Sequence, residues 1–299
     1  MSKKILLSIV LAMAMTIVAN TASAAGGDGP DKKMSAEEFM ASLHFQTGRI
    51  TLPGGVATLD MPASFRYLPP ADATHLLVDG WGNPSGGSTL GMIVPSDVSP
   101  LSANGWAVNV SFDKDGHVKD DDANSIKYDE LLKSMQDGIN ESNAERKKNG
   151  YAELSLIGWA EQPTYDSQTH KLFWAKNIKF SDSPDNTLNY NVRVLGRDGV
   201  LVLNAISSMG QIDRIKSEMR TVTAFTEFTS GNRYADFDSK TDKVAEYGIA
   251  ALVAGGVAAK LGLFGKLFAV LLAAKKVIFL AVAGIGGAIV KFFKGKKND

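Results

Sequence analysis

The chain of 299 residues contains no cysteine. It therefore has no disulfide bridges, no thiol nucleophile and no thiolate metal ligands, which excludes the disulfide-stapled secreted scaffolds and thiol enzymes. A domain without cross-links must be stabilised by its hydrophobic core. Roughly two hundred residues between the two ends of the chain are enough to bury one.

Short motifs that mark catalysis are also missing from the sequence. There is no GxSxG elbow, no HExxH pair and no phosphate-binding loop with its lysine. The four histidines, at positions 44, 75, 117 and 170, are not spaced as metal ligands. His170 lies near Tyr165 and Asp166, but a role in a hairpin is favoured over a polar site. We predict no catalytic, cofactor-binding or metal residues, and a non-catalytic protein is favoured over an enzyme.

The N-terminal region carries lysines and no acidic residue. Lys3 and Lys4 precede the apolar run Ile5–Val18, and Ala22-Ser23-Ala24 supplies the small residues that a signal peptidase recognises. This pattern predicts a signal peptide over residues 1–24, with an uncleaved N-terminal anchor as the alternative. The protein is then exported.

The C-terminal region lacks acidic residues between Glu246 and Asp299. Its apolar blocks predict a membrane segment over residues 244–293, followed by a basic tail at 294–299. Tyr247–Gly265 and Val277–Phe293 are the two candidate crossings. The apolarity of the second block favours two helices, and the lysines of the tail favour one. A buried helical hairpin of a soluble protein is the remaining alternative.

The charge is distributed unevenly along the chain. It has 32 basic and 32 acidic residues in all, but 22 basic and 30 acidic residues fall between positions 25 and 243, a net charge of −8. Nucleic-acid binding relies on basic residues that neutralise phosphates, so we expect no nucleic-acid partner. The basic C-terminal tail suits an anionic lipid surface.

The region between the two ends predicts an exported α+β domain over residues 25–230, with an antiparallel sheet and helices packed on it. Strands separated by short turns favour antiparallel pairing. A polar linker at 231–243 leads to the membrane segment. The expected helices cover residues 35–44, 70–78, 128–149 and 211–225, and the expected strands lie in 49–61, 89–94, 106–112, 153–159, 170–180, 187–195 and 200–206.

Tryptophans are the residues most suited to line a ligand groove in this region. We favour the view that Trp81, Trp106, Trp159 and Trp174 fill the core or its edges. Trp81 is the best candidate for binding, because it lies in the loop-like stretch DGWGNPSGG.

The stretch SFDKDGHVKDDD at 111–122 resembles a calcium loop in part. Asp113, Asp115 and Asp122 fall at ligand positions around Gly116, but the first position is Ser111 and the last ligand is not glutamate. We therefore favour a hairpin turn at Asp113–Gly116 and a helical start at 120–122 over a metal site.

Several segments carry a resemblance to a known family. SFDKDGHVKDDDA, ERKKNGY, GWAEQPTYDSQTHKLFWAK, LNYNVRVLGRDGVLVLNA and GNRYADFDSKTDKVAEYGIAALVAGG, with DGWGNPSGG and LGMIVP before them, resemble a bacterial family of predicted membrane-anchored proteins of unknown function. The resemblance runs from about residue 48 to the first apolar block. It implies an exported domain with a C-terminal membrane anchor and brings no catalytic residues.

Together these features predict a membrane-anchored protein of the bacterial envelope, in the cytoplasmic membrane with its main domain outside the cytoplasm. We expect a non-catalytic interaction module whose partners are the lipid bilayer and another envelope protein. An envelope hydrolase and a sensor for a metal or small ligand are the alternatives. A buried pair of titratable groups would favour the hydrolase, and a large exposed apolar patch would favour the interaction module.

Overall fold

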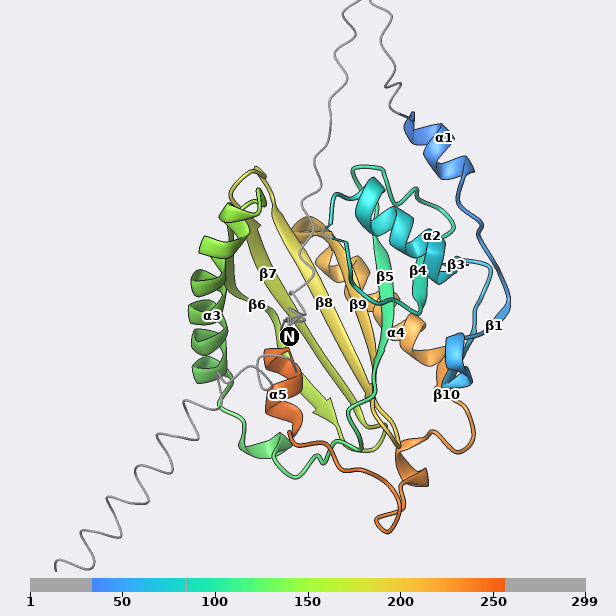
Figure 1. The fold of residues 1–299 in the computed structure, drawn as a ribbon, viewed down its shortest axis with the longest axis vertical. Helices are drawn as coiled ribbons and strands as arrows, with labels where there is room; N and C mark the ends of the chain where they lie inside the picture. Colours follow the sequence, from blue (N-terminus) through green and yellow to red (C-terminus); the bar gives the residue numbers. More distant parts are fainter. Residues whose placement is uncertain (1–33, 84, 256–299) are drawn as a thin grey trace, which may run out of the picture. The chain divides into compact units, whose positions relative to one another are not determined.

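A seven-stranded antiparallel sheet forms the centre of the computed structural model, which describes residues 34–83 and 85–255 (Figure 1). Each strand pairs with its neighbours in antiparallel fashion. In spatial order the strands are β3 (Phe65–Leu68), β4 (Gly91–Pro95), β5 (Ala107–Asp113), β9 (Val200–Ser208), β8 (Asn186–Leu195), β7 (Lys171–Phe180) and β6 (Leu154–Asp166).

A second, three-stranded sheet and five α-helices complete the fold of the described residues. The small sheet has the order β1 (Arg49–Thr51), β2 (Ala57–Asp60) and β10 (Thr226–Phe228). The helices are α1 (Ala36–Ala41), α2 (Pro70–His75), α3 (Tyr128–Lys148), α4 (Ile212–Ala224) and α5 (Ile249–Ala254). The predicted α+β class, with an antiparallel sheet and helices packed on it, is confirmed.

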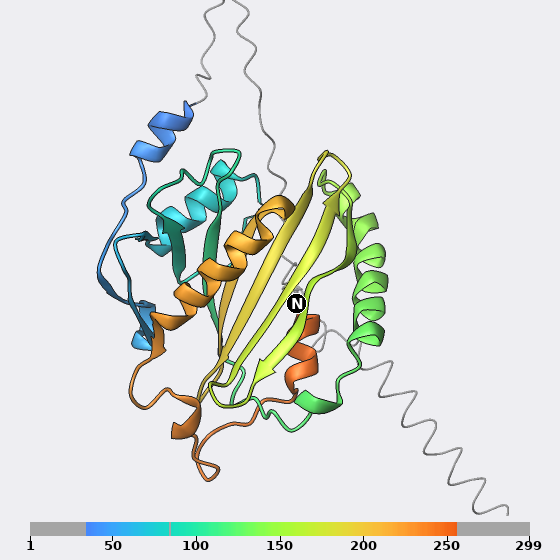
Figure 2. The same cartoon turned by 180° about the vertical axis from the view of Figure 1, so that it is seen from behind.

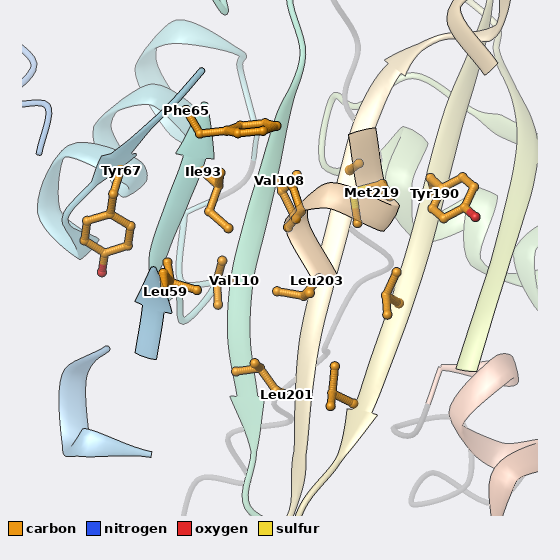
Figure 3. Packing of buried hydrophobic residues seen from close by; sticks show 14 of the residues in the cluster. Leu59, Phe65, Tyr67, Ile93, Val108, Val110, Tyr190, Leu201, Leu203 and Met219 are labelled. Carbon is orange, nitrogen blue, oxygen red and sulfur yellow. The ribbon is translucent and has the colours of Figure 1, made fainter. Parts of the chain in front are cut away.

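One face of the large sheet packs against α4, which crosses it in Figure 2. Apolar residues alternate along β5, β9 and β8 on this side, as the two-residue period of a strand requires. Figure 3 shows Val110, Leu203 and Tyr190 from these strands beside Met219 of α4. This packing is the main hydrophobic core, and we call this side the α4 face.

The opposite face carries three helices at its margins, and we call it the helix-flanked face (Figure 1). Leu76, at the end of α2, packs with Met92 of β4. Ile139 of α3 packs with Ile178 of β7, and Leu252 of α5 packs with Trp174. Each margin therefore has its own apolar cluster.

Most predicted elements are present within a few residues of their expected ends. The helix expected over 128–149 is α3, and the helix expected over 211–225 is α4. The helix expected from residue 35 is α1, and its capping box forms between Ser35 and Glu38. The strands β3 and β10 were not predicted. Both are short, at four and three residues, so alternation in the sequence gives little signal.

The predicted hairpin turn at Asp113–Gly116 is wrong. The strand β5 ends at Asp113, and its two neighbours are β4 and β9. The chain after Gly116 runs away from β5 and pairs in parallel with the C-terminal region, through the bridge between His117 and Val244. The predicted helical start is present as one 3₁₀ turn, Ala123–Ser125.

The segment expected to be a polar linker, residues 231–243, contacts the sheet domain. Phe237 stacks on His117 at 3.9 Å between ring centroids, and Asp242 forms an ion pair with Arg197 in the turn between β8 and β9. The segment is therefore held against the domain at its middle and near its C-terminal end.

The first residues of the expected membrane segment also belong to the domain. Ile249, Leu252 and Val253 of α5 are buried in the cluster with Trp174. Among residues 34–83 and 85–255, no helix combines the length and apolarity that a membrane crossing requires. The signal peptide at 1–24, the second candidate crossing and the basic tail lie outside the described residues.

Candidate functional site

The centre of the helix-flanked face is polar, although its margins are apolar. We call this region the polar floor. It consists of side chains from four adjacent strands: Asn109 and Ser111 of β5, Asn204 of β9, Asn189, Asn191 and Arg193 of β8, and Lys176 of β7.

Strand register brings these side chains into rows. Asn204 pairs with Asn109 on one side and with Asn191 on the other, so three asparagines lie side by side across three strands. Trp174 of β7 is the next member of the row, opposite Asn191. In the neighbouring row, Lys176 lies opposite Asn189. The alternating positions of β5, β9 and β8 face α4 and are mostly apolar, which fixes the floor on the helix-flanked face.

The asparagines form a directed hydrogen-bond network. The Nδ2 atom of Asn191 donates to the backbone and side-chain oxygens of Asn189, each at 2.9 Å. Asn189 in turn donates to Oδ1 of Asn204 at 2.8 Å. At the edge of the floor, the Thr89 hydroxyl donates to Oδ1 of Asn109 at 2.7 Å. These bonds hold the amides in fixed orientations, which is a requirement for a selective polar surface.

Two cationic side chains project from the floor. Lys176 is 7% exposed, and within the described part of the chain no carboxylate lies within ion-pair distance of its Nζ atom. Burial, with a further contribution from the charge of Arg193, lowers the pKa of Lys176 to about 8. The ammonium group of Lys176 therefore lies where it is poorly solvated, and no carboxylate of the described chain pairs with it.

Arg193 lies over the neighbouring aromatic ring. Its guanidinium carbon is 4.9 Å from the ring centroid of Trp174, and its Nη1 atom donates to the backbone oxygen of Val192 at 3.2 Å. Burial lowers the pKa of Arg193 to about 10, and the charge of Asp113 opposes that shift. A guanidinium held over an indole by this contact has restricted freedom, which limits the directions in which its N–H groups donate.

A second group of polar side chains lies where the C-terminal segment meets the domain. We call it the aromatic cluster: His117, Asp120, Tyr165, His170, Tyr234 and Phe237. The Tyr165 hydroxyl donates to Oδ2 of Asp120 at 2.8 Å and lies 3.1 Å from Nδ1 of His170. Tyr234 stacks on His170 at 3.9 Å between centroids.

The members of the aromatic cluster are engaged with one another. The Tyr234 hydroxyl donates to the backbone oxygen of Val118 at 3.1 Å, and burial raises the pKa of Tyr234 to about 12. The His117 ring is buried between Tyr234 and Phe237, and burial lowers the pKa of His117. Because these contacts join residues 117–120 and 165–170 to residues 234–237, the cluster fastens the C-terminal segment.

The structure separates the residues that the sequence placed together near His170. Tyr165 and His170 meet in the aromatic cluster, but Asp166 accepts from the Thr169 hydroxyl at 2.7 Å in the turn between β6 and β7. His170 has a φ of +53°, a left-handed conformation that fits this tight turn. The expected hairpin role of this stretch is confirmed.

The aspartates of 111–122 are directed to separate partners. Asp115 accepts from the Tyr247 hydroxyl at 2.8 Å. Asp122 accepts from the backbone N–H groups of Ile249 and Ala250 at 2.9 and 3.2 Å, at the start of α5. In the described ranges, no group of three or more His, Asp or Glu side chains converges as a metal site would.

Three of the four tryptophans are fully packed in the interior. Trp81, Trp106 and Trp174 are buried, as expected of core residues, and Trp159 is half-buried. Trp81 donates from Nε1 to the backbone oxygen of Pro100 at 3.1 Å and packs in the cluster under α2. Trp81 therefore does not line a ligand surface, whereas Trp174 lies beneath Arg193 at the polar floor.

An open cavity of about 380 Å³ lies elsewhere, at the junction of α4 and the small sheet. Its walls include Arg49, Asp60 and Glu227, which carry charges of both signs. The polar floor differs from this cavity because its two cations share a face with a hydrogen-bonded set of amides. The floor is thus the stronger candidate for a binding surface.

Sequence analysis missed the polar floor. The signal was present as polar residues at every second position in LNYNVRV, with further asparagines in WAVNVSF and VLVLNAI. Alternation of this kind is typical of strands with one solvated face, so the sequence predicts that each of these polar residues is exposed. Only strand order brings Asn109, Asn204 and Asn191 into one row.

Comparisons with known proteins find a family and distantly similar solved structures. The model of the family described as "Protein of unknown function (DUF2167)" matches residues 44–286. A search of the curated proteins finds no match. The solution structure of cyanobacterial PsbP (CyanoP) from Synechocystis sp. PCC 6803 is similar, with a TM-score of 0.35 and 9% identity, covering 68% of this chain and 98% of that one.

The crystal structure of the Ran-binding protein Mog1p from Saccharomyces cerevisiae is similar to the same degree. Its TM-score is 0.34 at 11% identity, and the match covers 66% of this chain and 100% of that one. Both scores are low, so neither similarity bears on what the polar floor does.

Proposed function

We propose a binding function for this chain, which belongs to the DUF2167 family of proteins of unknown function. In this proposal the protein is a non-catalytic module of the bacterial envelope. The polar floor is its ligand-binding face. The observation that carries the proposal is the position of Lys176 and the asparagine row. They lie at the centre of the helix-flanked face, between the apolar clusters of its margins.

The chemistry of the floor supports binding over catalysis. Asn109, Asn189, Asn191 and Asn204 are amides, which donate and accept hydrogen bonds without gaining or losing protons. Their orientations are fixed by the network, so they are prepared for a ligand before it arrives, which reduces the entropy lost on binding. The alternative of an envelope hydrolase has its titratable groups in the aromatic cluster, where Asp120 is occupied by two tyrosine hydroxyls.

We also propose that the module is exported and held at the cytoplasmic membrane, with the domain outside the cytoplasm. The signal pattern at 1–24 and the apolar sequence after α5 support this placement. Since Ile249, Leu252 and Val253 pack in the domain, Val277–Phe293 is the stretch that best suits a crossing. Another envelope protein or a small envelope ligand would then reach the floor.

Site-specific crosslinking in the native membrane tests the ligand face. A photoreactive amino acid in place of Asn204, on the floor, is expected to give a discrete adduct in the membrane fraction. The same amino acid in place of Lys179, a half-buried residue on the other face of β7, serves as the control. Equal adducts at both positions, or none at Asn204, would contradict the assignment of the floor.

Fractionation tests the placement. The full chain is expected to stay in the membrane fraction after an alkaline wash, and its mature form to begin near residue 25. Recovery of the full chain in the soluble fraction would overturn the membrane proposal and leave the floor assignment intact.

A further inference from the structure

We propose that Lys176 and Arg193 bind an oxyanion, a phosphate or carboxylate group, on the polar floor. This inference rests on the proposed binding function and adds the chemical class of the ligand. It begins from two positive side chains on adjacent strands, with Trp174 and Asn191 between them in the register.

The geometry places both charges on the same face. Lys176 follows Trp174 by two residues on β7, and Arg193 follows Asn191 by two residues on β8. Because the two strands are antiparallel, the cations lie on opposite sides of the row formed by Trp174 and Asn191. Two residues along a strand advance about 6.6 Å, so the backbones of the two cations are about 13 Å apart along the strands. Both side chains are long enough to reach toward the central row, and the Arg193 guanidinium already lies over Trp174.

The charge balance of the floor is incomplete without an anion. Burying an ammonium costs free energy unless an opposite charge or several hydrogen bonds offset it. Lys176 is buried, and the positive charge of Arg193 further disfavours its charged form. A bound oxyanion would supply the missing negative charge between the two cations.

The surrounding groups suit an oxyanion more than a metal cation or an apolar ligand. A guanidinium presents paired donors that match the oxygens of a carboxylate or phosphate, and an ammonium adds a point charge. The asparagine amides of the floor add N–H donors that carry no charge of their own. Asp113 is the carboxylate whose charge acts on Arg193, whereas none pairs with Lys176 in the described part of the chain.

The test measures the melting temperature of the full chain in detergent with sodium phosphate, sodium acetate or sodium chloride at equal ionic strength. A ligand that binds only the folded state raises the melting temperature. At about ten times its dissociation constant, phosphate or acetate is expected to raise it by about 3 °C or more above chloride. A parallel sample with phosphatidylglycerol in the micelles distinguishes a lipid phosphate from a free one.

Two matched variants decide the assignment. Lys176→Met is expected to abolish the response and to raise the melting temperature in chloride, because the buried uncompensated charge is gone. Lys179→Met makes the same change on the same strand but at a half-buried position on the opposite face, and is expected to retain the full response. Lys176→Arg, which keeps the charge, is expected to retain part of it.

The inference is overturned if none of the oxyanions, the lipid included, differs from chloride, or if Lys179→Met loses the response as fully as Lys176→Met does. In either case a positive crosslink at Asn204 would still support a binding face for a ligand of other chemistry. The two proposals can therefore fail separately.

Discussion

Arg197 and Asp242 form a two-point ion pair, with the Nε atom of Arg197 2.7 Å from Oδ2 of Asp242 and its Nη2 atom 3.0 Å from Oδ1. Arg197 lies in the turn between β8 and β9, and Asp242 lies 45 residues later in the C-terminal segment. The pair fastens residues 231–243 to the end of the sheet. Hydrogen bonds from a guanidinium to both carboxylate oxygens are the strong form of this contact.

Removing this pair is expected to loosen the C-terminal segment. In Arg197→Gln, amide hydrogens of residues 231–250 should exchange faster with deuterium, while those of β8 and β9 should change little. Arg214→Gln is the control, because Arg214 pairs with Asp97 at a more exposed site. Unchanged exchange in residues 231–250 would show that the aromatic cluster alone holds the segment.

The same ion pair makes the stability of the fold depend on pH in acid. Hydrogen bonds donated by Arg197 lower the pKa of Asp242 from 3.8 to about 2. A carboxylate with a lowered folded-state pKa contributes stability that is present above its unfolded pKa and lost as the pH falls through the folded one. Unfolding followed from pH 5 to pH 2 should therefore show an acid loss between about 4 and 2 that is smaller in Asp242→Asn than in the unchanged chain.

Any side chain at Gly116 is expected to lower the stability of the domain. Its φ is +108°, and a Cβ atom there would lie 2.7 Å from the backbone oxygen of Lys243. Gly116→Ala should lower the free energy of unfolding by about 2 kcal/mol or more, from backbone strain and this clash together. Gly158→Ala, where φ is ordinary and a Cβ meets nothing within 4 Å, should cost far less. Urea denaturation of the two variants measures the difference.

His117 is expected to make stability depend on pH near neutrality. Burial lowers its pKa below 6.5, against the opposing effects of the Gly196 and Arg197 carbonyls and the charges of Asp120 and Asp242. Below about pH 6.5, His117 binds a proton in the unfolded chain more readily than in the folded chain. The contribution of His117 to stability is therefore complete above about pH 6.5 and falls below it. His117→Phe keeps a ring between Tyr234 and Phe237 and should flatten this part of the profile. An identical slope in both proteins from pH 7 to 5.5 would rule out His117 as its source.

A carboxylate placed on the polar floor is expected to compete with a bound anion. Asn204→Asp keeps the oxygen that accepts from Asn189 and adds a negative charge beside the asparagine row. The variant should bind phosphate more weakly than the unchanged chain, by at least about tenfold if one unit charge interaction is offset. Titration calorimetry with phosphate measures the ratio. A tighter or equal affinity would place the anion away from the floor.

Local structure was predictable wherever neighbours in the sequence decide it. The capping box of Ser35 and Glu38, the helical spacing of α3 and the turn at Gly196–Gly199 all rest on contacts within a few residues. These signals give the α+β class and most element ends. They do not depend on strand order.

The features that matter for function depend on contacts between distant parts of the chain. The bend after Gly116 is fixed by the backbone of Lys243 and Ala245, more than 120 residues away, and local turn chemistry gave no sign of that pairing. The apolar residues of α5 suit a membrane or a protein core equally, and only their packing in the cluster with Trp174 shows that they belong to the core. The polar floor required the pairing of β5, β9 and β8.

The most direct test of the account is the titration of Lys176 itself, followed by carbon NMR of the chain labelled at the lysine Cε atoms and assigned with Lys176→Met. We expect one lysine resonance to titrate near pH 8, because burial and Arg193 disfavour its charge, and to shift to higher pH when phosphate is added. A Lys176 resonance that titrates near the ordinary value of about 10.4, or one that phosphate leaves unmoved, would contradict the oxyanion site.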